Sequence, residues 1–149
     1  MTEARQTART PAGFKSLDAR LGWRGASKGE GDIFDVRYRP TVGRRLIAEY
    51  DGDSGSAWIV FEDPVSYRVC DERELLLYWH QREEEGAPIA FAYEIAHSAY
   101  LDEMAAGLTA LSDGVLRHFL LGGQNLCLEV ITTDLPEIHY ERPDPLARD

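Results

Sequence analysis

A predicted hairpin near the end of the chain constrains the fold more than any other feature of the sequence. Two apolar runs fill residues 115–132 and flank the turn-forming sequence GGQN at 122–125, a combination typical of a β-hairpin. With the turn on those four residues, Leu121 lies opposite Leu126 and His118 lies opposite Glu129. Because side chains alternate along a strand, one face of this hairpin is almost entirely apolar. We expect that face to be core, and its members are Phe119, Leu121, Leu126, Leu128 and Val130.

The opposite face of the hairpin is mixed. It carries His118 and Glu129 among apolar neighbours, so we expect a paired polar group there. A carboxylate can orient an imidazole and raise its basicity, which makes His118 and Glu129 the candidate acid-base pair of a small hydrolase or transferase. Oppositely charged pairs are also a common way to stabilise a sheet, worth a few tenths of a kcal/mol to roughly 1 kcal/mol. We favour this structural interpretation.

Hydrophobic periodicity predicts the remaining elements. Short alternating stretches bounded by Gly, Pro, Asp and Ser indicate strands at 33–38, 44–50, 57–62, 65–70 and 89–96. Helices are predicted at 71–84, where Asp71 and Glu74 have the spacing of a capping box, and at 98–111, with Ser98 as the N-cap. A chain of 149 residues suits one domain. The sequence therefore predicts an α+β fold with one antiparallel sheet of about six or seven strands and two helices packed on one face.

The N-terminal region differs in composition from the rest of the chain. Residues 1–31 are rich in Arg, Thr, Gly and Ser, and we expect them to form a flexible basic arm. Within this arm, a few apolar residues are spaced so that they could form one amphipathic turn docked on the body; they are Phe14, Leu17, Leu21 and Trp23. The globular domain is expected at 32–140, and a C-terminal tail at 141–149.

The charge is distributed unevenly along the chain. The net charge is −10, yet residues 1–48 carry ten basic and five acidic side chains, whereas residues 49–149 carry six basic and twenty-one acidic ones. An acidic body repels nucleic acid and anionic membranes and attracts basic partners. The apolar runs are far shorter than the roughly 20 residues of a membrane span. The two cysteines do not make a disulfide framework, and no apolar signal segment opens the chain, so a cytoplasmic protein is expected.

No recognised catalytic or cofactor motif occurs in the sequence. The chain lacks a phosphate-binding loop, a dinucleotide fingerprint, a nucleophile elbow, a zinc-protease motif and a Cys-x-x-Cys pair. The stretch DGDSG at 51–55 resembles a calcium loop only superficially, because strands rather than helices are predicted around it. The four histidines are too dispersed to predict a zinc site. We therefore expect neither a cofactor nor a metal, and the sequence argues against an enzyme more than for one.

The helix predicted at 71–84 is acidic at both ends. At its C-terminal end, three carboxylates lie against the negative pole of the helix dipole, which costs roughly a few tenths of a kcal/mol each; they are Glu83, Glu84 and Glu85. At the other end, the acidic surface is extended by Asp71, Glu72 and Glu74. Solvation of a helix end explains such charges, and so does a binding surface for the Lys and Arg side chains of a partner.

In size, acidity and predicted layout, residues 33–140 resemble small bacterial immunity proteins, which neutralise a toxin by direct binding. The resemblance covers the general build and no specific motif, so it assigns no role to any residue. It implies an acidic protein-binding module that blocks a basic partner, plausibly a bacterial toxin. Two alternatives stay open: a small hydrolase or transferase using His118 and Glu129, and a structural or adaptor subunit whose N-terminal arm orders on a partner chain.

Overall fold

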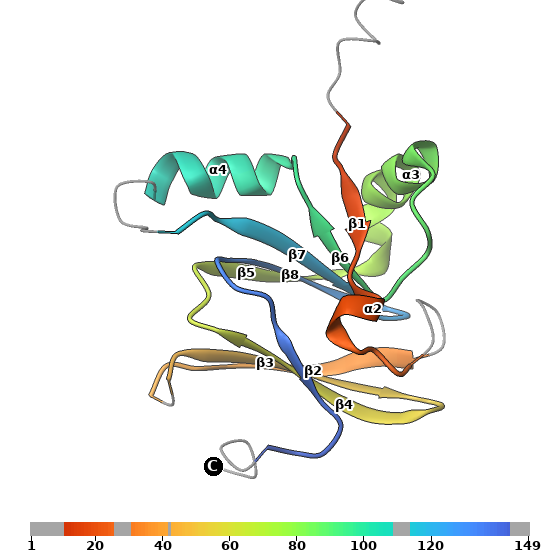
Figure 1. Ribbon diagram of the computed structural model, residues 1–149, viewed down its shortest axis with the longest axis vertical. Helices are drawn as coiled ribbons and strands as arrows, with labels where there is room; N and C mark the ends of the chain where they lie inside the picture. The colour runs from red at the N-terminus through yellow and green to blue at the C-terminus, as the bar shows by residue number, and fades with distance from the viewer. Residues whose placement is uncertain (1–10, 26–30, 42, 109–113, 144–149) are drawn as a thin grey trace, which may run out of the picture.

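Two antiparallel sheets and a layer of helices build this α+β protein. The computed structural model describes residues 11–25, 31–41, 43–108 and 114–143. Figure 1 shows three layers, in which helices α3 (Leu76–Glu85) and α4 (Ala99–Leu108) cover one face of a five-stranded sheet and a four-stranded sheet packs on the other face. The predicted α+β class and the two helices on one sheet face are confirmed. The strands, however, are divided between two sheets, where the sequence predicts one.

The five-stranded sheet has the strand order β1-β6-β7-β8-β5, and every neighbouring pair is antiparallel. Its strands are β1 (Phe14–Ser16), β5 (Ser66–Asp71), β6 (Ala92–Ile95), β7 (Arg117–Gly122) and β8 (Leu126–Thr132). The four-stranded sheet has the order β2-β3-β4-β9, with β2 (Gly31–Arg39), β3 (Arg45–Gly52), β4 (Gly55–Glu62) and β9 (Glu137–His139). The first three of these are consecutive antiparallel neighbours and form a meander. The chain then crosses to the other sheet after Asp63, which has a positive φ of 48°, and Pro64.

The helix after β5 begins and ends as the sequence predicts. A single 3-10 turn, η1 (Glu72–Leu75), leads directly into α3. The predicted capping box is confirmed, because the Arg73 N–H donates to the Asp71 carboxylate at 2.8 Å and the Asp71 N–H donates to Glu74 at 3.0 Å. Gly86 ends α3 with a φ of 74°, a left-handed conformation that favours glycine. Residues 109–111 of the second predicted helix lie outside the described residues.

The main core fills the space between the two sheets. Apolar side chains of β7 and β8 at most 1% exposed pack against the inner face of the four-stranded sheet; they are Phe119, Leu121, Leu128 and Val130. The Phe119 ring lies 6.1 Å from the Phe61 ring of β4, measured between centroids. The predicted core face is therefore confirmed. Arg117, the charged residue on this face, donates to both carboxylate oxygens of Glu94 at 2.8 Å.

The β7–β8 hairpin has a different register from the one predicted. Leu121 pairs with Leu128 and His118 pairs with Ile131, because the turn lies one residue further along the chain. Asp32 on β2 holds the turn there: its carboxylate accepts the N–H groups of Asn125 and Leu126, each at 3.1 Å. The pairing is shifted by two residues, and since side chains alternate with a period of two, every side chain stays on its predicted face.

Residues 11–25 pack on the body instead of forming a loose arm. Phe14 in β1 pairs with Ile95 in β6, and Leu17 is 2% exposed. The Trp23 ring stacks on Phe91 with centroids 4.0 Å apart. The predicted docking of the apolar residues is therefore right, although Phe14 lies in a strand and not in a helical turn.

The short helix α2 (Asp18–Leu21) anchors this N-terminal segment through polar bonds as well. The Asp18 carboxylate accepts the N–H groups of Phe91 and Ala92 at 3.0 and 2.9 Å. The prediction of a flexible arm through residue 31 thus fails for residues 11–25, because a segment with few apolar residues can still be held by backbone hydrogen bonds and a single aromatic stack. Residues 1–10 and 26–30 lie outside the described part of the chain.

Candidate functional site

His118 and Glu129 meet on the helix-side face of the five-stranded sheet. The predicted register places them directly opposite one another. In the structure they lie diagonally across the β7–β8 ladder, because His118 pairs with Ile131 and Glu129 pairs with Leu120. Their side chains nevertheless touch, with His118 Nε2 2.8 Å from Glu129 Oε1. Both residues are 0% exposed. The paired polar group expected on this face is confirmed.

The pair belongs to a longer chain of hydrogen bonds. On one side, His118 Nδ1 lies 2.7 Å from the Ser98 hydroxyl. On the other side, Arg68 Nε donates to Glu129 Oε2 at 2.7 Å. The chain of contacts therefore runs from Ser98 through His118 and Glu129 to Arg68, and it joins the start of α4 to the edge strand β5. We call these four residues the polar network.

The hydrogen-bond partners fix the tautomer of His118. Glu129 as a carboxylate can only accept, so Nε2 of His118 carries the proton and donates it. In the neutral imidazole Nδ1 is then the acceptor, and the Ser98 hydroxyl donates to it. The Ser98 oxygen in turn accepts the Leu101 N–H at 3.0 Å, which makes Ser98 the N-cap predicted from the sequence. Every member of the network is thus satisfied.

The environment keeps Glu129 ionised despite its burial. Burial alone would raise the pKa of Glu129, but the hydrogen bonds from His118 and Arg68 and the positive charge of Arg68 outweigh this effect, and the pKa of Glu129 is lowered. For Arg68, burial would lower the pKa, yet the bond and charge of Glu129 raise it overall. The two groups therefore remain charged at neutral pH. A buried charge of this kind is stable only while it is paired and hydrogen-bonded.

Two tyrosines and a cysteine surround the network. The Arg68 guanidinium carbon lies 4.0 Å from the centroid of the Tyr100 ring, and the Tyr100 ring lies edge-on to His118 at 5.4 Å. Burial, followed by the charge of Glu129, raises the pKa of Tyr78. Burial also raises the pKa of Cys70 to about 11, so this thiol stays protonated and is a poor nucleophile at neutral pH.

A cavity of about 340 Å³ lies beside the network, between α3 and the start of α4. Its lining includes Arg68 and Ser98 from the network and Tyr78 and Tyr100 from its surroundings. His118 and Glu129 do not line it. A small molecule in this cavity would therefore meet the serine and the arginine directly, and the histidine only through the serine.

The six acidic residues of the predicted partner surface fall into two groups at opposite ends of one helical segment. Residues 72–85 form a continuous segment of η1 and α3, which at about 1.5 Å per α-helical residue separates the ends by roughly 15 to 20 Å. In the first group, Asp71 and Glu74 are engaged in the capping box. Glu72 follows Asp71 at the start of η1.

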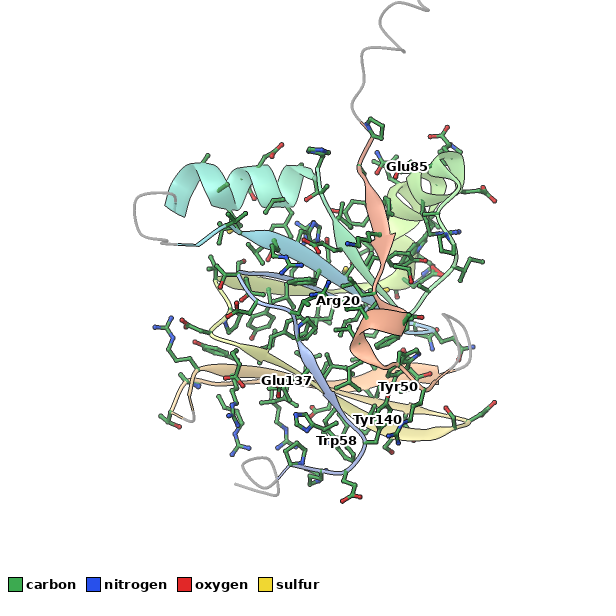
Figure 2. All side chains as sticks on the ribbon, in the orientation of Figure 1. Arg20, Tyr50, Trp58, Glu85, Glu137 and Tyr140 are labelled. Atoms are coloured by element: carbon green, nitrogen blue, oxygen red, sulfur yellow. The ribbon has the colours of Figure 1, made fainter. Side chains whose placement is uncertain are left out.

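The second acidic group has an internal structural role as well. The carboxylate of Glu85 accepts the N–H groups of Gly13 at 3.1 Å and Phe14 at 3.1 Å, and Figure 2 labels it at the end of α3 beside β1. Glu84 lies 3.3 Å from His80, one turn earlier. Glu83 is exposed. The cost of placing Glu85 at the helix C-terminus is therefore offset by its hold on the N-terminal segment.

The sequence does not predict that Arg68 and Ser98 join His118 and Glu129 in one network. Ser98 is visible in the sequence as an N-cap, and nothing in its position indicates a bond to a histidine 20 residues away. Arg68 lies 61 residues from Glu129. Only the pairing of β5 with β8 brings them together, through the register Arg68↔Glu129, and the strand order is not encoded in any local pattern.

Among the described residues, no group of three His, Cys, Asp or Glu side chains could hold a metal ion. No helix in the described part of the chain is long and apolar enough to cross a membrane.

Comparison with known proteins gave no significant similarity: no family model, no curated protein and no solved structure matches this chain.

Proposed function

We propose that this protein is an acidic binding module for a basic protein, and that the outward face of α3 is its contact surface. The observation that carries the proposal is an exposed pair of large apolar side chains, Leu76 and Leu77, which are 61% and 63% exposed. None of the residues of α3 itself is buried. Large exposed apolar groups rimmed by polar residues are typical of protein-binding sites.

The charge around these leucines favours a basic partner. Glu83 and Glu84 are exposed on the same helix, two turns beyond the leucines. Residues 49–149 carry twenty-one acidic against six basic side chains, and such a field accelerates the approach of a positively charged protein. The leucines would supply buried contact area and the carboxylates would steer association. A toxin that acts on nucleic acid has the required basic surface, which agrees with the resemblance to immunity proteins.

A photo-crosslinking amino acid at position 77 tests the contact surface directly. In the cell that encodes the chain, we expect the crosslinker to capture one basic protein, identified by mass spectrometry. The matched control is the same crosslinker at Phe34, which is 57% exposed on β2 in the other sheet. Equal capture of the same protein from both positions, or capture of an acidic protein at position 77, would contradict the proposal.

Two double variants then distinguish the apolar contact from the electrostatic attraction in the purified complex. Leu76→Ser with Leu77→Ser should weaken binding by about 30-fold or more, as expected for truncated anchor residues. Glu83→Gln with Glu84→Gln should slow association and flatten its salt dependence, with little change in dissociation. Asp53→Asn with Glu141→Gln removes the same charge from exposed positions outside α3 and serves as the control.

A further inference from the structure

The serine of the polar network differs from His118 and Glu129 in reaching the cavity. Ser98 is 8% exposed and lines the cavity between α3 and α4, whereas His118 and Glu129 are 0% exposed. Its hydroxyl oxygen lies 2.7 Å from His118 Nδ1, and His118 Nε2 lies 2.8 Å from Glu129 Oε1. A hydroxyl, an imidazole and a carboxylate connected in this order form a proton relay that can activate a serine. In serine proteases, Nε2 of the histidine faces the serine and Nδ1 faces the carboxylate. Here Nδ1 faces Ser98 and Nε2 faces Glu129.

The relay is held rigidly enough for this chemistry. The Leu101 N–H donates to Ser98 Oγ at 3.0 Å and so fixes the serine rotamer. Arg68 shares the carboxylate of Glu129 and keeps it charged, so an imidazolium formed on His118 would have a fixed counter-charge. The Tyr100 ring lies edge-on to the imidazole, with centroids 5.4 Å apart, and helps to exclude water from it.

The cavity is also lined by the two residues that begin α4. Ala99 and Tyr100 line it at the start of α4, a helix of ten residues. The first N–H groups of an α-helix have no partner within the helix and favour negative charge. The volume of about 340 Å³ lies at the lower end of the range for small-molecule sites, roughly 300 to 1,000 Å³.

We propose that Ser98 is a nucleophile for acyl transfer and that this cavity hydrolyses small carboxylic esters, an activity separate from the proposed protein binding. Ser98 Oγ attacks the ester carbonyl carbon while its proton moves to His118 Nδ1. The tetrahedral intermediate collapses and expels the alkoxide, which takes a proton from a water molecule in the cavity and leaves hydroxide, and an acyl-serine remains. The hydroxide then attacks the acyl carbon, the carboxylic acid leaves, and Ser98 Oγ regains its proton from His118. Ser98 and His118 are the catalytic residues, and Glu129 is a positioning residue.

A fluorophosphonate probe tests the proposal on the full-length wild-type protein. We expect one probe per chain, and peptide mapping should place it on Ser98. Labelling must vanish when the protein is unfolded in urea before the probe is added. The absence of a probe on Ser98 in the folded protein, or a probe on another serine, would overturn the proposal.

Three variants sharpen the assignment. Ser98→Asn keeps a residue that caps helices well, and it should lose labelling while keeping the melting temperature within a few degrees. His118→Gln should slow labelling by about 10²-fold, because the general base is removed. Ser66→Ala, at a serine whose hydroxyl lies 2.7 Å from that of Tyr100 beside the same cavity, should label at the wild-type rate. An unchanged labelling rate in His118→Gln would show that no relay activates Ser98 and would overturn the proposal.

Discussion

The two faces of the β7–β8 hairpin are buried to the same degree and are stabilised by different physics. The face toward the four-stranded sheet is apolar, with Phe119 and Leu121 both 1% exposed. The face toward the helices holds His118 and Glu129, both 0% exposed. On the first face, stability follows the apolar area removed from water. On the second face, it depends on every partner being present and correctly charged. Equal burial therefore says nothing about how a face responds to mutation or pH.

This difference also explains how the helices are held. The core between the sheets is shared by many side chains of both sheets, whereas the start of α4 is joined to β7 by the hydrogen bond between Ser98 and His118 and by the edge-on contact of Tyr100 with His118. An apolar contact can shift without a large penalty, but a buried hydrogen bond requires a particular geometry. We infer that the polar network fixes the position of α4 over the sheet, and the predictions below test this contrast in order of decreasing effect.

Removal of the N-terminal segment should have the largest effect, because this segment contributes to both faces. Phe14 packs on the helix side and Leu17 on the side between the sheets. Each core residue lost in this way costs about 2 to 5 kcal/mol, which together approaches the whole stability of a typical domain, about 5 to 15 kcal/mol. A chain that begins at residue 26 should therefore fail to fold, as judged by circular dichroism. Removal of residues 1–10 alone is the control, and the two truncations melting at the same temperature would refute this role.

Glu129→Leu should lower the free energy of unfolding by about 1 to 3 kcal/mol at pH 7, measured by urea denaturation. The substitution leaves the buried Nε2–H group of His118 without its acceptor, whereas Arg68, whose side chain is 48% exposed, can be solvated by water. Adding Arg68→Met and His118→Leu should restore most of the loss, because apolar side chains need no hydrogen-bond acceptor. If the triple variant were as unstable as the single one, loss of packing and not loss of pairing would explain the effect.

Ser98→Ala should cost about 1 kcal/mol, the usual value for a lost helix cap, plus the hydrogen bond to His118. Ser98→Asn should recover the cap. The difference in stability between the two variants then gives the contribution of the cap alone. Hydrogen exchange of the α4 amides is the measurement, since the affected bonds join α4 to the sheet. Equal protection of α4 in both variants and the wild type would show that the network does not fix this helix.

Leu76→Ser with Leu77→Ser should have the smallest effect on stability. Both side chains are more than half exposed, and surface changes of this kind stay within about 0.5 kcal/mol. Thermal melting of the free protein provides the measurement. A loss of several kcal/mol would mean that the leucines belong to the folded body, and the binding assays with this variant would then lose their meaning.

Local patterns in the sequence predict most of the elements and the faces of the hairpin. The alternation around Phe119 and Leu121 identifies the core face, and the spacing of Asp71 and Glu74 identifies the start of the helix. Both signals depend only on neighbouring residues, as strand periodicity and helix capping do. The presence of a polar pair at His118 and Glu129 follows from the same alternation, and an error of two residues in the register leaves it intact.

The division into two sheets and the extent of the site were beyond the reach of local patterns. Nothing near Val65 indicates that the chain leaves the meander and joins the other sheet, because this depends on where β8 lies. Arg68 reaches Glu129 only because β5 pairs with β8. The folded state of residues 11–25 was missed for a similar reason, since Asp18 and Trp23 find their partners at Phe91, more than 60 residues away.

The pH dependence of two matched variants tests the contrast between the faces most directly. The pKa of Glu129 is lowered by folding from the ordinary value of 4.5, so its stabilising contribution is complete above that pH and is lost as the pH falls through the lower, folded value. The free energy of unfolding of Glu129→Gln and Leu121→Ala should be compared with the wild type between pH 7 and about pH 3. Other carboxylates cancel in each difference, because the variants retain them.

We expect the deficit of Glu129→Gln, which is its loss of unfolding free energy relative to the wild type, to be smaller at the acidic end than at pH 7, because the wild-type carboxyl group takes up a proton as the pH falls. The deficit of Leu121→Ala, about 2 to 5 kcal/mol, should stay constant over the same range. A deficit of Glu129→Gln that is equally large at both ends of the range would contradict the account, because the helix-side face would then be stabilised by packing in the same way as the face between the sheets.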